Sequence, residues 1–301
     1  MGRPSSRAEP RSNDEERGGR DGAIAIVIGL LLGLGTAVLA DALESTVKSA
    51  EEIEEIYGVS VLATVSTERS KKREASSLAL VRSPFSPGAE ACRVLRNNLG
   101  FINFQQDMKT ILVTSASPDE GKSTIAANLA VVLSEAGKKV ALVVCDFHRP
   151  AADQFFEIDQ QHGLSSFLGG VEGLEVVLQQ PAGFDNLWVL PAGGLPPNPS
   201  ELLGSSKMEQ LVASLRDSVD WVILDSAPLL AVADTAAAVR WVDGVLIATR
   251  ATVTTRDAAR RSRSQLEHVG ARILGVVLWS PKPAESGGDS YFQGYSSPAS
   301  R

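Results

Sequence analysis

Residues suited to phosphate chemistry lie near the middle of this 301-residue chain. The apolar residues 111–113 predict a buried strand, the apolar residues 125–133 predict a helix, and Gly121-Lys122-Ser123-Thr124 precedes that helix. A glycine lets the backbone approach a phosphate closely, and the N–H groups of a helix N-terminus carry partial positive charge. Lys122 would neutralise the β- and γ-phosphates, and the Ser123 hydroxyl would ligate Mg²⁺. The segment therefore predicts a phosphate-binding loop.

The loop departs in one position from the usual G-x-x-x-x-G-K-[ST] spacing, because Ala116 stands where the first glycine is expected. A simpler interpretation is a helix start capped by a serine or an aspartate, with Lys122 merely solvated. The strand before the loop and the helix after it favour nucleotide binding, so we expect ATP with Mg²⁺. The expected nucleotide contacts are Ser115, Ala116, Asp119, Glu120, Gly121, Lys122, Ser123 and Thr124.

Two aspartates follow apolar segments further along the chain. Asp146 comes after residues 139–145, and Asp225 comes after residues 221–224. An aspartate at the end of such a strand is typical of the second nucleotide motif, whose carboxylate holds Mg²⁺. The alternative roles are a helix cap for Asp225 and a turn-capping residue for Asp146. With the phosphate loop present, we expect metal ligation by Ser123, Asp146 and Asp225, and catalysis by Lys122, Asp146 and Asp225.

Strand and helix patterns alternate along most of the chain. This alternation predicts an α/β protein of the P-loop NTPase type, with three layers and a mostly parallel sheet. Ligands bind such sheets at the carboxyl ends of the strands, where the loop and both aspartates are expected. The proline-rich residues 191–199 are expected to be irregular. The predicted strands are 59–65, 111–113, 139–145, 187–190, 221–225, 244–249 and 272–279, and the predicted helices are 50–58, 89–101, 125–133, 201–219 and 255–268.

An uncharged segment, residues 22–40, lies near the N-terminus. A helix needs about 17–25 apolar residues to cross a bilayer, so this segment predicts one transmembrane helix before the α/β domain. A buried core helix is one alternative. A signal peptide is another, because Ala40-Asp-Ala42 fits a cleavage site. Cleavage would release an ATP-binding domain into a compartment without ATP, which favours the membrane span.

The charges around this segment and the phosphate loop favour opposite orientations. Five arginines before residue 22 favour a cytoplasmic N-terminus. The loop requires ATP and so favours a cytoplasmic C-terminal domain, and we give this second argument more weight. We therefore expect a single-pass protein of the cell membrane. The expected organisation is a disordered segment 1–21, the span 22–40, a juxtamembrane helix and linker 41–87, a P-loop domain 88–280 and a disordered tail 281–301.

The composition restricts other functions. The net charge of −7 does not favour non-specific binding to nucleic acid. The two cysteines, Cys92 and Cys145, are far apart and indicate reduced structural side chains rather than a disulfide or a metal site.

Three charged residues, Glu90, Arg93 and Arg96, recur every third position on the predicted helix 89–101. This spacing places them roughly along one face of the helix. The simpler interpretation is a solvated surface with one intrahelical ion pair, worth a few tenths of a kcal/mol. A protein–protein contact is the alternative, and the spacing alone favours the solvated surface.

Several motifs in order resemble those of the bacterial tyrosine kinases, P-loop autokinases of capsule and exopolysaccharide assembly. The resemblance runs from about residue 22 to residue 279. It implies a membrane-anchored, ATP-dependent protein-tyrosine autokinase that regulates capsular or exopolysaccharide biosynthesis or export. The matching segments are the uncharged span, E-x-x-R-x-x-R at 90–96, S-x-x-x-x-E-G-K-S at 115–123, the extra aspartate motif at 144–150, the proline loop at 191–203 and D-S-A-P at 225–228.

The same resemblance implies partners and acceptors. The E-x-x-R-x-x-R motif mediates ring-like homo-oligomers in this family, so Glu90, Arg93 and Arg96 would be oligomer contacts. Tyr291 and Tyr295 in the tail would be the phosphate acceptors. A transmembrane chain-length-determinant activator and a tyrosine phosphatase are the further partners that the resemblance implies.

Some positions depart from the family pattern. The motif D-x-D-x-R is here Val144-Cys-Asp146-Phe-His148, so one aspartate is a valine and the arginine is a histidine. An asparagine that contacts adenine is replaced by Trp279, which could stack on a base instead. The missing carboxylate motivates a second hypothesis, a degenerate ATP-binding scaffold of the same assembly system. A partitioning-type ATPase is disfavoured, because no lysine lies between residues 110 and 120.

Overall fold

The computed structural model describes residues 29–30, 45–66, 78, 83–104 and 106–281. The chain divides into two units after Ser45, and in the first unit only Gly29 and Leu30, both in helical conformation, and Ser45 are described. Within the described residues, no helix is long and apolar enough to cross a membrane. The predicted span 22–40 lies almost entirely outside the described residues, as do the segment 1–21 and the tail from residue 282.

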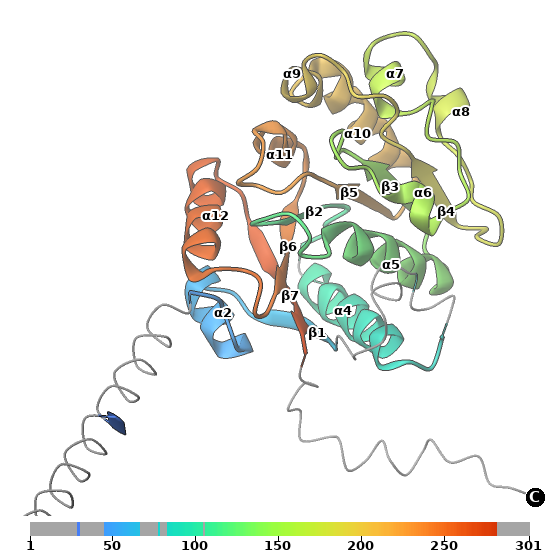
Figure 1. Cartoon of the computed structure of the whole chain (residues 1–301). Helices are drawn as coiled ribbons and strands as arrows, with labels where there is room; N and C mark the ends of the chain where they lie inside the picture. Colours follow the sequence, from blue (N-terminus) through green and yellow to red (C-terminus); the bar gives the residue numbers. More distant parts are fainter. Residues whose placement is uncertain (1–28, 31–44, 67–77, 79–82, 105, 282–301) are drawn as a thin grey trace, which may run out of the picture. The chain divides into compact units, whose positions relative to one another are not determined.

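The second unit, from Thr46 onward, is built on one sheet whose described strands have the order β1-β7-β6-β2-β5-β3-β4 (Figure 1). Each pair of neighbouring strands in this sheet is parallel. The predicted α/β class with a parallel sheet is confirmed. The strands are β1 (Val61–Ser66), β2 (Thr110–Ser115), β3 (Val140–Val144), β4 (Leu187–Leu190), β5 (Trp221–Asp225), β6 (Gly244–Arg250) and β7 (Ile273–Ser280).

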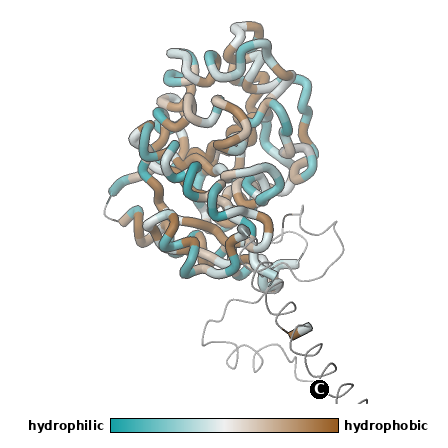
Figure 2. The backbone as a smooth tube through the Cα atoms, turned by 60° about the vertical axis from the view of Figure 1, so that its left-hand side comes forward, coloured by the Kyte–Doolittle hydropathy of each residue, from teal (hydrophilic) through white to brown (hydrophobic). Residues whose placement is uncertain are grey.

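The central strands are buried along their whole length. All six residues of β2 and all five of β3 are buried. Parallel sheets that are covered on both faces show such continuous apolar segments rather than an alternation. Figure 2 shows hydrophobic residues along the inner segments of the unit. The register places Asp225 opposite Val113 of β2 and Val144 of β3, at the carboxyl ends of these strands.

Helices cover both faces of the sheet (Figure 1). On one side, α4 (Pro87–Asn103) and α5 (Lys122–Glu135) pack against each other, and on the other side lie α2 (Ala50–Tyr57), α10 (Ser206–Ser218) and α12 (Arg256–His268). Most of these helices begin at a hydroxyl side chain that accepts a free N–H group of the first turn. The capping residues are Ser49 for α2, Ser86 for α4, Ser205 for α10 and Thr255 for α12.

The predicted helix 201–219 is two helices, so this prediction was wrong. The first is α9 (Pro199–Leu203), which starts at a proline, and the second is α10. Gly204 and Ser205 separate them, and the Ser205 hydroxyl accepts the N–H of Met208 to start the second helix. The irregular proline-rich loop therefore ends one residue before the predicted limit.

Short helical elements lie in the connections and were not predicted. Elements of three to five residues are too short to show a helical period in the sequence. They are α6 (Ala152–Phe155), α7 (Leu164–Leu168), α8 (Leu174–Val177), α11 (Asp234–Ala238) and the 3₁₀ helix η1 (Val239–Trp241).

The residues before α4 are part of the same sheet unit. β1 pairs with β7 along the edge of the sheet, and α2 packs against α12. The sheet thus includes residues that precede position 88, where the sequence predicts the start of the P-loop domain.

Replacing Ser205 by alanine is expected to lower the free energy of unfolding by about 1 kcal/mol, because the N–H of Met208 loses its acceptor. Ser205→Asp keeps an acceptor at the same position and is the matched control. Urea denaturation followed by circular dichroism measures both variants. Equal stability of the alanine variant and the wild type would contradict the role of this cap.

Candidate nucleotide-binding site

The phosphate loop connects β2 to α5 and leaves the start of that helix without a side-chain cap. Gly121 is the N-cap residue, and its φ of 85° is a left-handed conformation that favours glycine. α5 has 14 residues, and no side chain at its N-cap accepts a hydrogen bond from the N–H groups of the first turn. The free N–H groups and the helix dipole together form a site suited to an anion.

Lys122 is held beside a buried carboxylate. Its ammonium group lies 2.7 Å from Asp146 Oδ2 and 3.2 Å from Ser123 Oγ. Asp146 follows β3, and its Oδ1 accepts the backbone N–H groups of His148 and Arg149 at 3.1 and 3.0 Å. Helix α5 and strand β3 therefore bring together two predicted catalytic residues that are distant in the sequence.

The charges in this cluster determine the protonation states of Lys122 and Asp146. Burial lowers the pKa of Lys122, but the negative charges of Asp225 and Asp146 outweigh it and give a net increase. Burial raises the pKa of Asp146, but the Lys122 ammonium and the backbone amides of Arg149 and His148 outweigh it and give a net decrease. A positive lysine and a negative aspartate therefore face each other at neutral pH.

Asp225 ends β5 in the same cluster. Burial raises the pKa of Asp225 to about 6, despite the charge of Lys122 and a hydrogen bond with Ser123. Its buried Oδ1 has no hydrogen-bond partner among the described residues. Such an oxygen beside the Ser123 hydroxyl fits Mg²⁺, which takes one or two carboxylates together with phosphate oxygens. The described residues contain no group of three or more His, Cys, Asp or Glu side chains suited to a metal, so phosphate and water would complete the coordination.

A cavity of about 600 Å³ lies in front of the phosphate loop. The loop forms one wall, and the segments that follow β3 and β5 form the others. Lys122, Ser123 and Asp146 line it, whereas Asp225 does not. Apolar side chains complete the lining, among them Phe155, Pro228 and Val232. A cavity of this size and composition is typical of sites for small molecules. The predicted nucleotide contacts that line it are Asp119, Gly121, Lys122, Ser123 and Thr124, and the predicted metal ligand Asp146 lines it as well.

Three further predicted contacts are turned away from the cavity. Ser115, Ala116 and Glu120 are fully buried and do not line it. The Glu120 carboxylate accepts the N–H of Ala116 at 3.0 Å and the hydroxyl of Thr254 at 2.7 Å. Burial raises the pKa of Glu120 to about 7. These buried residues contact the phosphate loop on the side that faces the protein interior.

Two of the positions that depart from the family motif lie beside the cluster. Val144 is buried at the end of β3 and pairs in register with Asp225. His148 Nε2 lies 2.9 Å from Asp234 Oδ2, which links the segment after β3 to the start of α11. The valine therefore leaves an apolar side chain next to the carboxylates, and the histidine makes a polar contact with another loop.

The third departing position, Trp279, lies against the phosphate loop. A Cβ built on Gly121 would come within 2.5 Å of its Nε1 atom. That Nε1 is buried and has no hydrogen-bond partner within the described part of the chain. Position 121 therefore admits only glycine for two reasons, the left-handed backbone and the indole ring.

Sequence analysis missed two residues that contact the predicted ones. Thr254 binds Glu120, and Asp234 binds His148. Thr254 lies in the connection between β6 and α12, and Asp234 is the first residue of the short helix α11. No motif or spacing marks either position. The contacts depend on which connections meet in space, which the sequence pattern does not report.

The predicted oligomer contacts lie on α4, and none of them lines the cavity. Glu90 and Arg93 form an ion pair of 3.3 Å, and Arg93 also donates to the Pro84 carbonyl at 2.8 Å. Arg96 donates to the Val132 carbonyl of α5 at 3.5 Å. Both arginines therefore have contacts within the chain. The predicted acceptors Tyr291 and Tyr295 lie outside the described residues.

Comparison with known proteins agrees with this geometry. A model of the CobQ/CobB/MinD/ParA nucleotide binding domain matches residues 111–289. The match includes the phosphate loop, Asp146 and Asp225. The fold and the site are thus those of a P-loop nucleotide-binding domain.

Individual relatives narrow this class. Etk of Escherichia coli K12, a tyrosine-protein kinase, is 34% identical over 281 residues, which cover 85% of this chain and 38% of Etk. The tyrosine-protein kinase YwqD of Bacillus subtilis 168 is 34% identical over 209 residues, which cover 69% of this chain and 88% of YwqD. The chain belongs to this family of bacterial tyrosine-protein kinases, and it spans 38% of the length of Etk.

Solved structures of the same family share the fold. The kinase domain of the Escherichia coli tyrosine kinase ETK has a TM-score of 0.72 and 32% identity, and the match covers 80% of this chain and 97% of that one. The chimerical protein CapA2B2 has a TM-score of 0.71 and 31% identity, with 78% and 100% covered.

Glu120 is expected to make the folded state less stable as the pH rises. The carboxyl of the unfolded chain ionises near pH 4.5, whereas the folded one keeps its proton up to about pH 7. The contribution of Glu120 to the free energy of unfolding is therefore fully present below pH 4.5. It is lost as the pH rises to about 7, by an amount on the order of 3 kcal/mol.

Glu120→Gln cannot ionise, so this part of the pH dependence should disappear in that variant. The contribution of Asp225 has the same sign and remains in both proteins. Urea denaturation at about pH 5 and about pH 8 measures the difference. The exposed Glu135→Gln is the control. An unchanged pH dependence in Glu120→Gln would contradict the raised pKa of Glu120.

Proposed function

We propose that the chain is a membrane-anchored, ATP-dependent protein-tyrosine autokinase that regulates capsular or exopolysaccharide biosynthesis or export. One observation carries the proposal: Lys122 contacts Asp146 beside the uncapped start of α5, with Asp225 on the neighbouring strand. The relatives Etk and YwqD are named tyrosine-protein kinases, which supports tyrosine as the acceptor.

The residues of the site have distinct proposed roles. Lys122 and the first N–H groups of α5 neutralise the β- and γ-phosphates of ATP. Mg²⁺, when bound, neutralises further phosphate charge, and Ser123, Asp146 and Asp225 would hold it. Asp146 also orients the attacking phenol hydroxyl. Phosphoryl transfer depends mainly on positioning and charge neutralisation, so this set of groups suffices.

The proposed acceptors are Tyr291 and Tyr295 of a neighbouring copy. Glu90, Arg93 and Arg96 are proposed to hold the copies in a ring. Each phosphate adds about −1.5 to −2 charge, which would loosen contacts made by arginines. A transmembrane chain-length-determinant activator and a tyrosine phosphatase are the other proposed partners.

The proposed location is the cell membrane, with the P-loop domain on the cytoplasmic side. The uncharged residues 22–40 support a single transmembrane helix. The need for ATP supports the orientation. Nucleic acid is not a proposed partner, because the net charge of −7 repels phosphate backbones.

Incubation of the purified chain with ATP and Mg²⁺, followed by mass spectrometry of the tail, tests the kinase. Phosphate is expected on Tyr291 and Tyr295 of the wild type. It should be absent from Lys122→Met, which keeps an unbranched side chain one atom shorter and removes the charge. A variant with phenylalanine at both tail positions controls for other acceptors. A wild type that binds ATP and leaves both tyrosines unmodified would reject autokinase activity.

A second candidate function is a degenerate ATP-binding scaffold of the same assembly system. Val144 favours it, because this buried valine replaces the first aspartate of the family motif and lies opposite Asp225. A site with one carboxylate fewer would bind ATP without transferring its phosphate.

Val144→Asp distinguishes the two candidates. For a scaffold, calorimetry shows that the wild type binds ATP, mass spectrometry finds no transfer, and the aspartate restores phosphorylation of the tail. Val144→Asn has the same shape without the charge and should stay inactive. The aspartate is also expected to lower the free energy of unfolding, on the order of 1–3 kcal/mol, because the position is buried. Efficient transfer by the wild type would reject the scaffold.

A further inference from the structure

A buried carboxylate and a threonine hydroxyl meet behind the phosphate loop, outside the cavity. Glu120 accepts the N–H of Ala116 at 3.0 Å with one oxygen and the hydroxyl of Thr254 at 2.7 Å with the other. Glu120 is 0% exposed and Thr254 is 1% exposed. The proposed phosphoryl transfer uses neither side chain.

The contacts of Glu120 determine which way the N–H groups of the loop point. The N–H group of Ala116 is bonded inside the loop, whereas no side chain caps the N–H groups at the start of α5, where a phosphate would bind. A buried carboxylate with several donors is a rigid support, because breaking one bond leaves a polar group without a partner.

Thr254 fixes the position of Glu120 from the connection between β6 and α12. Its hydroxyl accepts the N–H of Arg250 at 3.0 Å and donates to Glu120. A hydroxyl has one hydrogen to donate, so these two partners define its orientation. The backbone position of Thr254 therefore determines where the carboxylate lies.

Residues 46–47 fix the backbone around Thr254. The N–H of Val47 donates to the Thr254 carbonyl at 2.9 Å, and the N–H of Thr252 donates to the Val47 carbonyl at 2.9 Å. Thr46 and Thr255 form an antiparallel bridge. Val47 is fully buried. These residues thus pair with the connection as a short strand.

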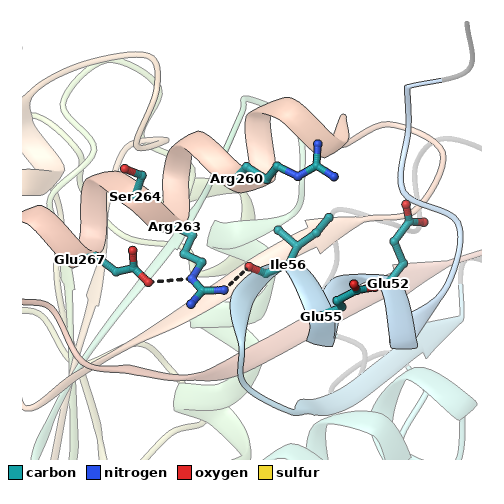
Figure 3. A pocket seen from close by; sticks show the side chains of 7 residues that line it. All are labelled: Glu52, Glu55, Ile56, Arg260, Arg263, Ser264 and Glu267. Carbon is teal, nitrogen blue, oxygen red and sulfur yellow. Dashed lines mark hydrogen bonds and ion pairs between the residues drawn. The ribbon is translucent and has the colours of Figure 1, made fainter.

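The helix that follows keeps this short strand in place. Figure 3 shows the shallow pocket between α2 and α12, where Arg263 donates to the Ile56 carbonyl at 2.8 Å. The Tyr57 and Ser262 hydroxyls lie 2.7 Å apart in the buried contact. Helix α12 begins directly after the connection that contains Thr254. The N-terminal part of the unit is therefore attached on both sides of this connection.

We propose that Glu120 and Thr254 are positioning residues for the phosphate loop, and that the pairing of residues 46–47 with Thr254 makes nucleotide affinity depend on this N-terminal segment. The contacts run from Val47 through Thr254 and Glu120 to Ala116. Breaking one of them releases the loop from its binding shape while the sheet stays intact. The proposal rests on the nucleotide-binding part of the proposed function and not on phosphoryl transfer.

Thr254→Val tests the contact with Glu120, because valine keeps the shape of threonine and removes the hydroxyl. The Mg²⁺ complex of fluorescent N-methylanthraniloyl-ADP is titrated into the full chain. At about pH 8, where the Glu120 carboxylate is ionised, the Kd is expected to rise about tenfold, the effect of losing one hydrogen bond to a charged group. Thr254→Ser keeps the hydroxyl and should bind like the wild type. An unchanged Kd in Thr254→Val would overturn the proposal.

Val47→Pro tests the pairing with the N-terminal segment, because proline has no N–H to donate. The Kd is expected to rise by a similar factor. Val47→Ala keeps the N–H, so it should bind like the wild type although it unfolds at a lower temperature. Val47→Asp is a second variant, since a charge cannot stay at this buried position. Wild-type affinity in folded Val47→Pro or Val47→Asp would overturn the proposal.

The double variant Val47→Pro/Thr254→Val tests whether both residues act along one path. It should bind no more weakly than Thr254→Val alone, and effects that multiply would overturn the proposal. Thermal unfolding identifies the variants that are folded. A wild type that binds the nucleotide but transfers no phosphate would reject the kinase and leave this inference standing.

Discussion

Three buried ionisable groups at the carboxyl ends of the parallel strands impose the strictest condition on this structure. Lys122, Asp146 and Asp225 lie where a single unpaired charge would be costly. The Lys122–Asp146 pair of 2.7 Å and the backbone N–H groups on Asp146 offset that cost. The cluster forms because β3 lies next to β5 and α5 starts at the carboxyl ends of the strands. Parallel strands with crossover helices satisfy this condition, since they place every strand end on one side.

The balance of charge in the cluster also determines what it can bind. One ammonium group faces two carboxylates, so a polyphosphate alone would meet net negative charge. A divalent cation would change this balance, and in the proposed function the unpartnered oxygen of Asp225 helps to hold one. In the proposed function, nucleotide and metal would therefore favour each other's binding at this site. Relative to the family motif, Val144 removes one negative charge from this site, and it pairs in register with Asp225.

The sequence predicts those parts of the fold that depend on local pattern. The buried strands are continuous apolar segments, and Lys122, Asp146 and Asp225 stand at their ends or in the loop motif. The order of the strands and the contact of Thr254 with Glu120 depend on segments that are distant in the chain, so no local pattern reports them. The prediction of one helix at 201–219 was wrong because the helical conformation ends at Gly204 and Ser205, whereas the helical spacing of the apolar residues continues.

The contact between Trp279 and Gly121 restricts substitutions at the two positions to different degrees. A side chain at position 121 is excluded while the indole is present, since its Cβ would lie 2.5 Å from Nε1. Loss of the tryptophan removes that obstacle, but the glycine still has a φ of 85°, which strains other residues. A change at position 279 therefore does not by itself make a side chain at position 121 acceptable, because the glycine keeps a second, independent constraint. The residue at position 279 thus affects which side chains fit at position 121, but it does not alone decide whether position 121 can change.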